Sequence, residues 1–197
     1  HDMGRHHCQG VRMIRAMVAG AVGGKTFATW NPADKGGSVT LSNSDRTMAC
    51  GGVPQSVRAA MGLVSGKWYW EVYFAAGDYL FAGVSNGSQS MGANLGATNS
   101  SGIQTNSYLF SPAASYPPGA GAIYAGEWIG FALDVGAGTL LVRRASATVV
   151  TITSLPTGGA LYPSAGGYSG NESCILNAGA TAFNQTVPAG YNPGVYQ

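Results

Sequence analysis

Charged residues are scarce in this sequence. They make up 9% of the 197 residues, against about a quarter in an average soluble domain. The formal net charge is +2, and the lysines and arginines are scattered along the chain. Proteins that bind nucleic acids usually carry a clustered basic patch or stripe. We therefore expect no nucleic-acid partner.

Histidine is absent after residue 7. Ser-His-Asp and Cys-His arrangements need an imidazole as general base, so neither can form in the body of the chain. Paired carboxylates are the remaining route to hydrolysis, but Glu71 is followed two positions later by a tyrosine, not by a second acid. We expect no enzyme, and assign turn or strand-pairing roles to the acids. These acids are Glu71, Asp78, Glu127, Asp134 and Glu172.

Cysteine is also rare, and long apolar runs are missing. Cys8, Cys50 and Cys174 are too widely spaced for a disulfide framework or a zinc motif. Metal-ligating residue types occur together at His6, His7 and Cys8. A metal site needs further ligands, however, which a chain terminus seldom supplies. We expect no metal and no cofactor, although a single ion held by a loop stays open. No apolar run reaches the roughly 18 residues of a membrane span, so no membrane insertion is expected.

The first 25 residues differ from the rest of the chain. We interpret residues 1–25 as a tag remnant followed by an N-terminal connecting segment. Two arginines precede the apolar part of Val11–Val22 as in a signal peptide, but this apolar run is short and begins too deep in the chain. Residues 26–197 are expected to form one domain, since a chain of this size can bury a full core.

Glycine is abundant, with 31 residues, and short β-rich runs alternate with Gly, Pro, Asn and Ser clusters. This punctuation is typical of an antiparallel β-sandwich. In Lys67–Ala75, Trp68, Trp70 and the next alternate residues form one bulky face, around which a core must assemble. The expected strands are Thr26–Trp30, Ser38–Ser42, Ser56–Val64, Lys67–Ala75, Tyr79–Ser85, Glu127–Val135, Thr139–Ala145, Thr148–Thr153, Leu161–Tyr168 and Glu172–Ala178.

One connection, Asn86–Ala125, is too long for a hairpin. Loops of this length in a compact domain are usually functional or disordered, and within it Ser107–Phe110 is the best candidate for a strand. Tyrosines beside Gly, Ser and Asn resemble the composition of an antibody binding surface. We therefore select four loop tyrosines as ligand-binding residues, and for each the alternative is a plug at the end of the sandwich: Tyr79, Tyr108, Tyr116 and Tyr124.

Several segments, in order, resemble a SPRY domain. The opening half is carried by Trp30-Asn31-Pro32-Ala33-Asp34-Lys35, Val39-Thr40-Leu41-Ser42 and Gly66-Lys67-Trp68-Tyr69-Trp70-Glu71-Val72. The second half is carried by Gly126-Glu127-Trp128-Ile129-Gly130-Phe131-Ala132-Leu133-Asp134, and by Leu161-Tyr162-Pro163 and Leu176-Asn177-Ala178-Gly179. The resemblance covers about residues 26–196. It implies an all-β fold, a two-sheet antiparallel sandwich of the concanavalin A-like, jelly-roll type.

The opening and closing segments are most similar to SPRY domains of bacteriophage tail and tail-fibre proteins. This resemblance implies a non-catalytic binding module in a virion tail, acting outside the host cell. Its partners would be a bacterial surface glycan or protein receptor and other tail proteins, in a homo-oligomer such as a trimer. A structural or assembly domain of a virion and a glycan-cleaving enzyme are the two alternatives.

Overall fold

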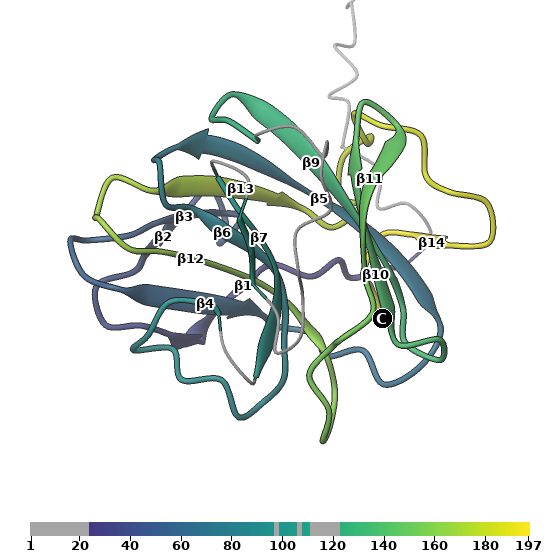
Figure 1. The fold of residues 1–197 in the computed structure, drawn as a ribbon, viewed down its shortest axis with the longest axis horizontal. Helices are drawn as coiled ribbons and strands as arrows, with labels where there is room; N and C mark the ends of the chain where they lie inside the picture. The colour runs from purple at the N-terminus through teal and green to yellow at the C-terminus, as the bar shows by residue number, and fades with distance from the viewer. Residues whose placement is uncertain (1–23, 97–98, 106–107, 111–122) are drawn as a thin grey trace, which may run out of the picture.

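The computed structural model describes residues 24–96, 99–105, 108–110 and 123–197. The predicted terminal segment, residues 1–25, therefore lies almost wholly outside the described residues, and its assignment stays a prediction. Over the described residues the chain forms two β-sheets that face each other (Figure 1). All strand pairs in the two sheets are antiparallel apart from one short parallel pair, which confirms the predicted all-β sandwich.

Among the described residues the first sheet has six strands. Their order across the sheet is β1 (Trp30–Lys35), β4 (Gln55–Ala59), β12 (Tyr162–Gly167), β6 (Phe81–Ser85), β7 (Ser100–Gln104) and β8 (Tyr108–Phe110). The second sheet has eight strands among the described residues. Its order is β11 (Ala147–Ile152), β10 (Thr139–Arg144), β9 (Glu127–Asp134), β5 (Lys67–Ala76), β13 (Ser173–Asn177), β3 (Thr47–Ala49) and β2 (Thr40–Ser42), with β14 (Asn192–Pro193) pairing parallel to β5.

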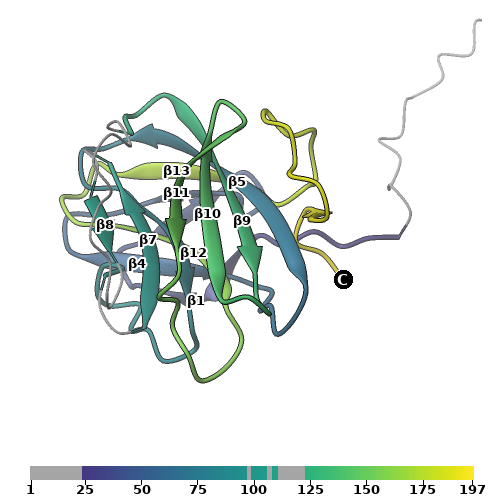
Figure 2. The same cartoon turned by 45° about the vertical axis from the view of Figure 1, so that its right-hand side comes forward.

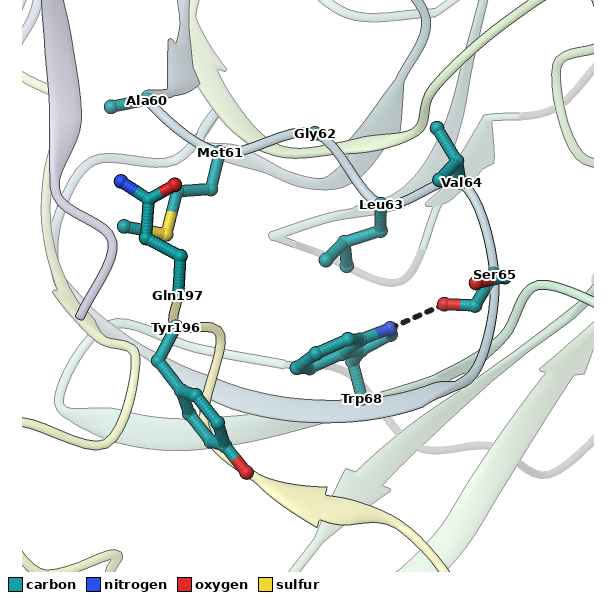
Figure 3. A pocket seen from close by; sticks show the side chains of 9 residues that line it. All are labelled: Ala60, Met61, Gly62, Leu63, Val64, Ser65, Trp68, Tyr196 and Gln197. Carbon is teal, nitrogen blue, oxygen red and sulfur yellow. Dashed lines mark hydrogen bonds between the residues drawn. The ribbon is translucent and has the colours of Figure 1, made fainter. Parts of the chain in front are cut away.

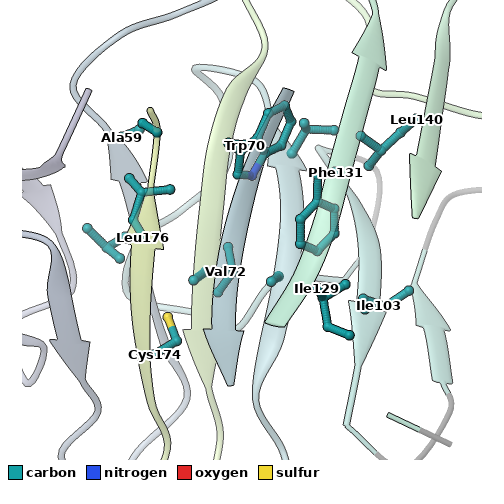
Figure 4. Packing of buried hydrophobic residues seen from close by; sticks show 14 of the residues in the cluster. Ala59, Trp70, Val72, Ile103, Ile129, Phe131, Leu140, Cys174 and Leu176 are labelled. Atoms are coloured by element: carbon teal, nitrogen blue, oxygen red, sulfur yellow. The ribbon is translucent and has the colours of Figure 1, made fainter. Parts of the chain in front are cut away.

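Strand β5 lies at the centre of the core, as its alternating pattern predicts. Trp70, Val72 and Phe74 are fully buried and belong to the cluster between the sheets. The Trp70 indole stacks on the ring of Phe131 from β9, with centroids 5.7 Å apart and planes 13° from parallel (Figure 4). Trp68 is only partly buried and packs against the rim of this cluster. Trp70, and not Trp68, is therefore the central anchor.

The opposite face of β5 is buried as well. The carboxylate of Glu71 accepts hydrogen bonds from the Tyr69 hydroxyl at 2.9 Å and from the amides of Asn184 and Gln185, both at 2.8 Å. The ring of Phe183 packs edge-on against Tyr69, with centroids 4.9 Å apart. Burial, together with the nearby carboxylate, raises the pKa of Tyr69 well above its usual value. Glu71 thus fastens a C-terminal segment to the sheet, the turn-pairing role that the sequence predicts.

Two predicted strands have the wrong bounds, and two strands were missed. The strand predicted at Ser56–Val64 is β4, and it ends at Ala59. The first strand begins at Trp30 instead of ending there, because Phe27 makes only an isolated bridge, to Tyr196. Strand β3 was not predicted; it is a three-residue strand that follows a turn of left-handed residues, Asn43–Asp45. Strand β7 was also not predicted, because Ser100–Gln104 is rich in Ser and Gly and depends on pairing with β6. The predicted strand within the long connection is present as β8.

The two ends of the described chain lie together. The amide of Thr26 donates to the carbonyl of Gln197 at 2.9 Å, and the Gln197 amide donates back at 3.1 Å. Figure 2 shows the start of the described chain running beside the yellow C-terminal end. Segments that precede and follow the sandwich would therefore attach at one edge of the domain.

Candidate functional site

Several strand ends converge at one end of the six-stranded sheet. Phe81, the first residue of β6, pairs with Gln104 at the end of β7 and with Gly166 near the end of β12. The turns that carry Tyr79 and Tyr168 leave the sheet at this same end. A pocket of about 380 Å³ lies here, and we call it the tyrosine pocket. It is lined by Tyr79, Phe81, Asn94, Gln104 and Tyr168.

The tyrosine pocket opens on the outer side of the sheet. Ala82 and Val84 belong to the core cluster, so Phe81 points to the opposite face, because side chains alternate along a strand. The segment 86–96 crosses this outer face and is tied to β4. The Ser56 hydroxyl donates to the carbonyl of Ala93 at 2.8 Å, and Arg58 donates to the carbonyl of Asn86 at 2.6 Å. These bonds hold Asn94 against the pocket.

Two tyrosines form the exposed wall of the pocket. Tyr79 is 48% exposed and Tyr168 is 53% exposed, and their ring centroids are 6.2 Å apart at a tilt of 54°. Neither phenol hydrogen-bonds to another residue that the structure describes, and the side-chain amides of Asn94 and Gln104 likewise have no such partner there. The pocket therefore presents aromatic surface together with unused hydrogen-bonding groups.

Glu172 holds the turn that carries Tyr168. Its carboxylate is fully buried and accepts hydrogen bonds from the amides of Ser169 at 3.0 Å and Gly170 at 2.7 Å, and from the Ser169 hydroxyl. Burial by itself raises the pKa of Glu172, but the hydrogen bonds from Ser169 and Gly170 outweigh it, so that the pKa lies below its ordinary value. The charged form is the one that this turn stabilises.

The same glutamate also packs against the turn that carries Tyr79. A Cβ atom on Gly77 would lie 2.7 Å from the Cα and Cγ atoms of Glu172, and one on Gly167 would lie 2.6 Å from its Cβ. Gly77 also has a φ of +101°, in the region that favours glycine. Both tyrosine-bearing turns are thus packed on one buried side chain, so Glu172 fixes the shape of the pocket.

The four tyrosines selected from the sequence have different positions. Tyr79 lines the pocket. The backbone of Tyr108 pairs with Gln104, which brings the start of β8 beside the pocket. The side chain of Tyr108 and the whole of Tyr116 lie outside the described residues. Tyr124 is 55% exposed and is not part of the pocket lining.

Tyr168 was not selected from the sequence, although a signal was present. It lies in Gly166-Gly167-Tyr168-Ser169-Gly170-Asn171, which has the same Tyr, Gly, Ser and Asn composition as the long connection. Tyr168 was not counted among the loop tyrosines because the sequence places it at the end of the predicted strand Leu161–Tyr168. Asn94 and Gln104 carry no signal of their own, because an amide in a loop or at a strand end is common in any domain.

A second cavity, which we call the terminal cavity, lies where the chain ends meet. It has a volume of about 280 Å³, and its walls include Leu63, Val64, Trp68 and Tyr196 (Figure 3). The Trp68 indole lies below Leu63 and donates to the Ser65 carbonyl at 2.7 Å. The Tyr196 ring meets Trp68 edge-on, with centroids 5.7 Å apart. The indole N–H of Trp68 in this cavity is thus already paired within the protein.

The described part of the chain contains no group of three or more His, Cys, Asp or Glu side chains that could hold a metal ion. It also has no helix that is long and apolar enough to cross a membrane.

No family model matches the sequence, and no curated protein matches it. Solved structures do match the fold. The PSpry domain of TRIM65 has a TM-score of 0.62 at 20% identity, over 77% of this chain and 92% of that domain. The SPRY domain of human HERC1 has a TM-score of 0.60 at 16% identity, over 75% of this chain and 96% of that one. Stonustoxin matches with a TM-score of 0.57 at 20% identity, over 77% of this chain and 27% of the toxin chain.

The chain therefore has the fold of a SPRY domain, as the sequence segments indicate. The match covers nearly the whole of each of these two SPRY domains. At these identities the likeness establishes the architecture, and function has to be argued from the site.

Proposed function

We propose that this domain is a non-catalytic binding module whose recognition surface includes the tyrosine pocket. The observation that carries the proposal is the pair Tyr79 and Tyr168, half-exposed and next to two amides without partners among the described residues. Exposed aromatic rings on rigid turns provide contact area at low entropic cost. A binding module is also the function for which the SPRY fold is typical.

The positions of the acids favour binding over catalysis. No acid of the described part of the chain lines the tyrosine pocket. Glu71 and Glu172 accept hydrogen bonds from neighbouring turns, and Asp134 pairs with Lys67 at 2.9 Å. Glu127 pairs with Arg144 at 2.6 Å. Each of these carboxylates is engaged in holding the fold, whereas a glycosidase needs two carboxyl groups facing one bond.

We further propose that the domain belongs to a bacteriophage tail or tail-fibre protein and binds a bacterial surface glycan or protein receptor. The support is the resemblance of the opening and closing segments to SPRY domains of such proteins. In this proposal the domain acts outside the host cell, on the virion tail, beside other tail proteins and in a homo-oligomer such as a trimer. Tyr108, Tyr116 and Tyr124 remain proposed contributors to the same surface.

The test is attachment of the fluorescently labelled domain to a panel of bacterial strains, measured by flow cytometry. Tyr79→Ala with Tyr168→Ala should reduce binding by well over tenfold, since an anchor residue at an interface contributes about 2 kcal/mol or more. The melting temperature should change little, because both rings are half-exposed. Thr151→Ala, at an exposed position of β11 in the other sheet, is the control that should bind normally.

Two outcomes would change the proposal. Undiminished attachment of the double variant would remove the tyrosine pocket from the recognition surface. Loss of attachment on Tyr124→Ala alone would extend that surface to Tyr124, as the sequence predicts.

The alternative, a virion assembly domain, is favoured by one observation. Val64 is 75% exposed beside Trp68 in the terminal cavity, an arrangement suited to a subunit contact. If Val64→Asp dissociated an oligomer seen by light scattering while no strain bound the wild-type domain, assembly would become the preferred function.

A further inference from the structure

We propose that the tyrosine pocket binds an uncharged saccharide. This inference rests on the proposed binding function and goes further by naming the chemical class of the ligand. It depends on four properties of the pocket as the described residues form it: a lining without charge, the aromatic platform, two amides with no side-chain partner there, and the rigidity that Glu172 confers.

Among the described residues, no charged side chain lines the pocket. Its five residues are neutral at physiological pH. The nearby buried charges are already compensated, since Glu172 accepts from the turn of Tyr168 and Arg58 pairs with Asp34 at 2.6 Å. An ionic group entering the pocket would lose hydration without gaining a counter-charge, which is costly. Acidic sugars, phosphates and ammonium groups are therefore disfavoured.

The two rings provide a platform and not a slot. With centroids 6.2 Å apart and a tilt of 54°, the Tyr79 and Tyr168 rings touch each other and leave no room for a group between them. A cation cage needs rings around the ligand, which this geometry does not supply. The outward faces suit a flat, weakly polar surface such as the C–H face of a sugar ring, because the ring face carries partial negative charge and C–H groups partial positive charge.

The amides match the hydroxyl groups of a sugar. Each amide offers two donors and an acceptor, and each hydroxyl both donates and accepts. Asn94 and Gln104 have no side-chain hydrogen bond to any other described residue, so their groups face the pocket unused. A sugar lying on the platform could pair with both amides. An apolar peptide side chain would instead cover these amides without satisfying them, at a cost of about 1–3 kcal/mol each.

The pocket is also held in shape before the ligand arrives. Glu172 anchors the turn of Tyr168 and is in contact with the backbone at Gly77, next to the turn of Tyr79. Ordering a loop on binding reduces affinity, so a wall fixed in advance favours weakly interacting ligands such as sugars. The volume of about 380 Å³ lies in the range of about 300–1,000 Å³ typical of small-molecule sites.

The experiment uses polysaccharide from a strain that the domain binds. The polysaccharide is released from the cells and divided by anion exchange into a neutral and an acidic fraction, and each fraction competes with cells for the labelled domain. A printed array of neutral, acidic and choline-bearing glycans provides a second, cell-free measurement. We expect the neutral fraction to compete and the array signal to fall on neutral glycans.

Variants identify the pocket as the site. Tyr168→Ala should weaken binding of the neutral array glycan about 30-fold, the factor typical of an interface anchor, while Tyr168→Phe keeps the ring and should change binding less than threefold. Gln104→Glu keeps the shape but removes the amide donors, and should weaken binding about fivefold. Thr151→Ala, on the exposed face of β11, is the control with unchanged binding.

Other results would overturn the inference. An ionic ligand would be identified by competition from the acidic fraction or from choline alone, or by tighter binding of Gln104→Glu. A protein ligand would be identified by loss of cell binding after protease treatment. In those cases sensitivity of cell attachment to Tyr168→Ala would leave the proposed binding function standing. No attachment to any strain together with no array signal would overturn both.

Discussion

Glu172→Gln tests how the tyrosine pocket is built. The wild-type carboxylate accepts from the amides of Ser169 and Gly170 and from the Ser169 hydroxyl. Glutamine has nearly the same shape, but one of its two oxygens becomes an NH₂ group. In the fully buried site this group would face a backbone donor, so at least one hydrogen bond is lost and two donors are left opposed.

The expected cost follows from these bonds. A hydrogen bond to a charged group contributes about 1.5–3 kcal/mol, and an unsatisfied buried donor costs about 1–3 kcal/mol. We therefore expect Glu172→Gln to lower the free energy of unfolding by about 2 kcal/mol. For a domain of this size that corresponds to a melting temperature about 4–8 °C lower. Binding should weaken too, because the turn of Tyr168 loses its anchor.

The pH dependence supplies a stricter test. The folded-state pKa of Glu172 lies below its ordinary value of 4.5, so its stabilisation is fully present above that pH and is lost as the pH falls through the folded-state pKa. The difference in stability between wild type and variant should therefore be largest at neutral pH and shrink in acid. Urea unfolding at several pH values measures it. Glu127→Gln, which disturbs a partly exposed ion pair with Arg144, is the control.

Equal stability of Glu172→Gln and wild type at neutral pH would refute the reasoning. So would a difference that stays constant into acid, since it would show that the charge of Glu172 is not what holds the turn.

Three further predictions concern the core. Trp70→Ala should destabilise the domain by about 3–5 kcal/mol, because it leaves a cavity beside a stacked ring; a near-neutral shift in chemical denaturation would count against its central position. Gly130→Ala should cost about 1–3 kcal/mol, because its Cβ would lie 2.4 Å from a buried tyrosine hydroxyl; an unchanged melting curve would contradict this packing. Burial raises the pKa of Cys50 to about 12 and also raises the pKa of Cys174. In a Cys8→Ser variant, a thiol reagent at pH 8 should therefore label these two cysteines only after the domain unfolds. Rapid labelling of the native domain would show that the core opens.

The sequence alone determined the features that depend on local alternation. In Lys67–Ala76 and Glu127–Asp134 bulky residues recur at every second position, and both segments form strands with their bulky faces in the core. The hairpin turn at Asp134 was also predictable from the local sequence. The Asp134 carboxylate accepts a hydrogen bond from the amide of Ala137, three residues later in the chain, at 3.0 Å. Period and turn chemistry act over a few residues, so the sequence carries them directly.

The tertiary structure decided the site. Tyr79 and Tyr168 are far apart in the chain, and they meet only because β6 and β12 pair in a register that places Phe81 opposite Gly166. Glu172 resembles any turn acid in the sequence, and its role follows from the close approach of Gly77, which only the packed fold creates. Strand pairing over such separations depends on the whole hydrophobic core and on which face of each strand it buries, and no local pattern specifies those contacts.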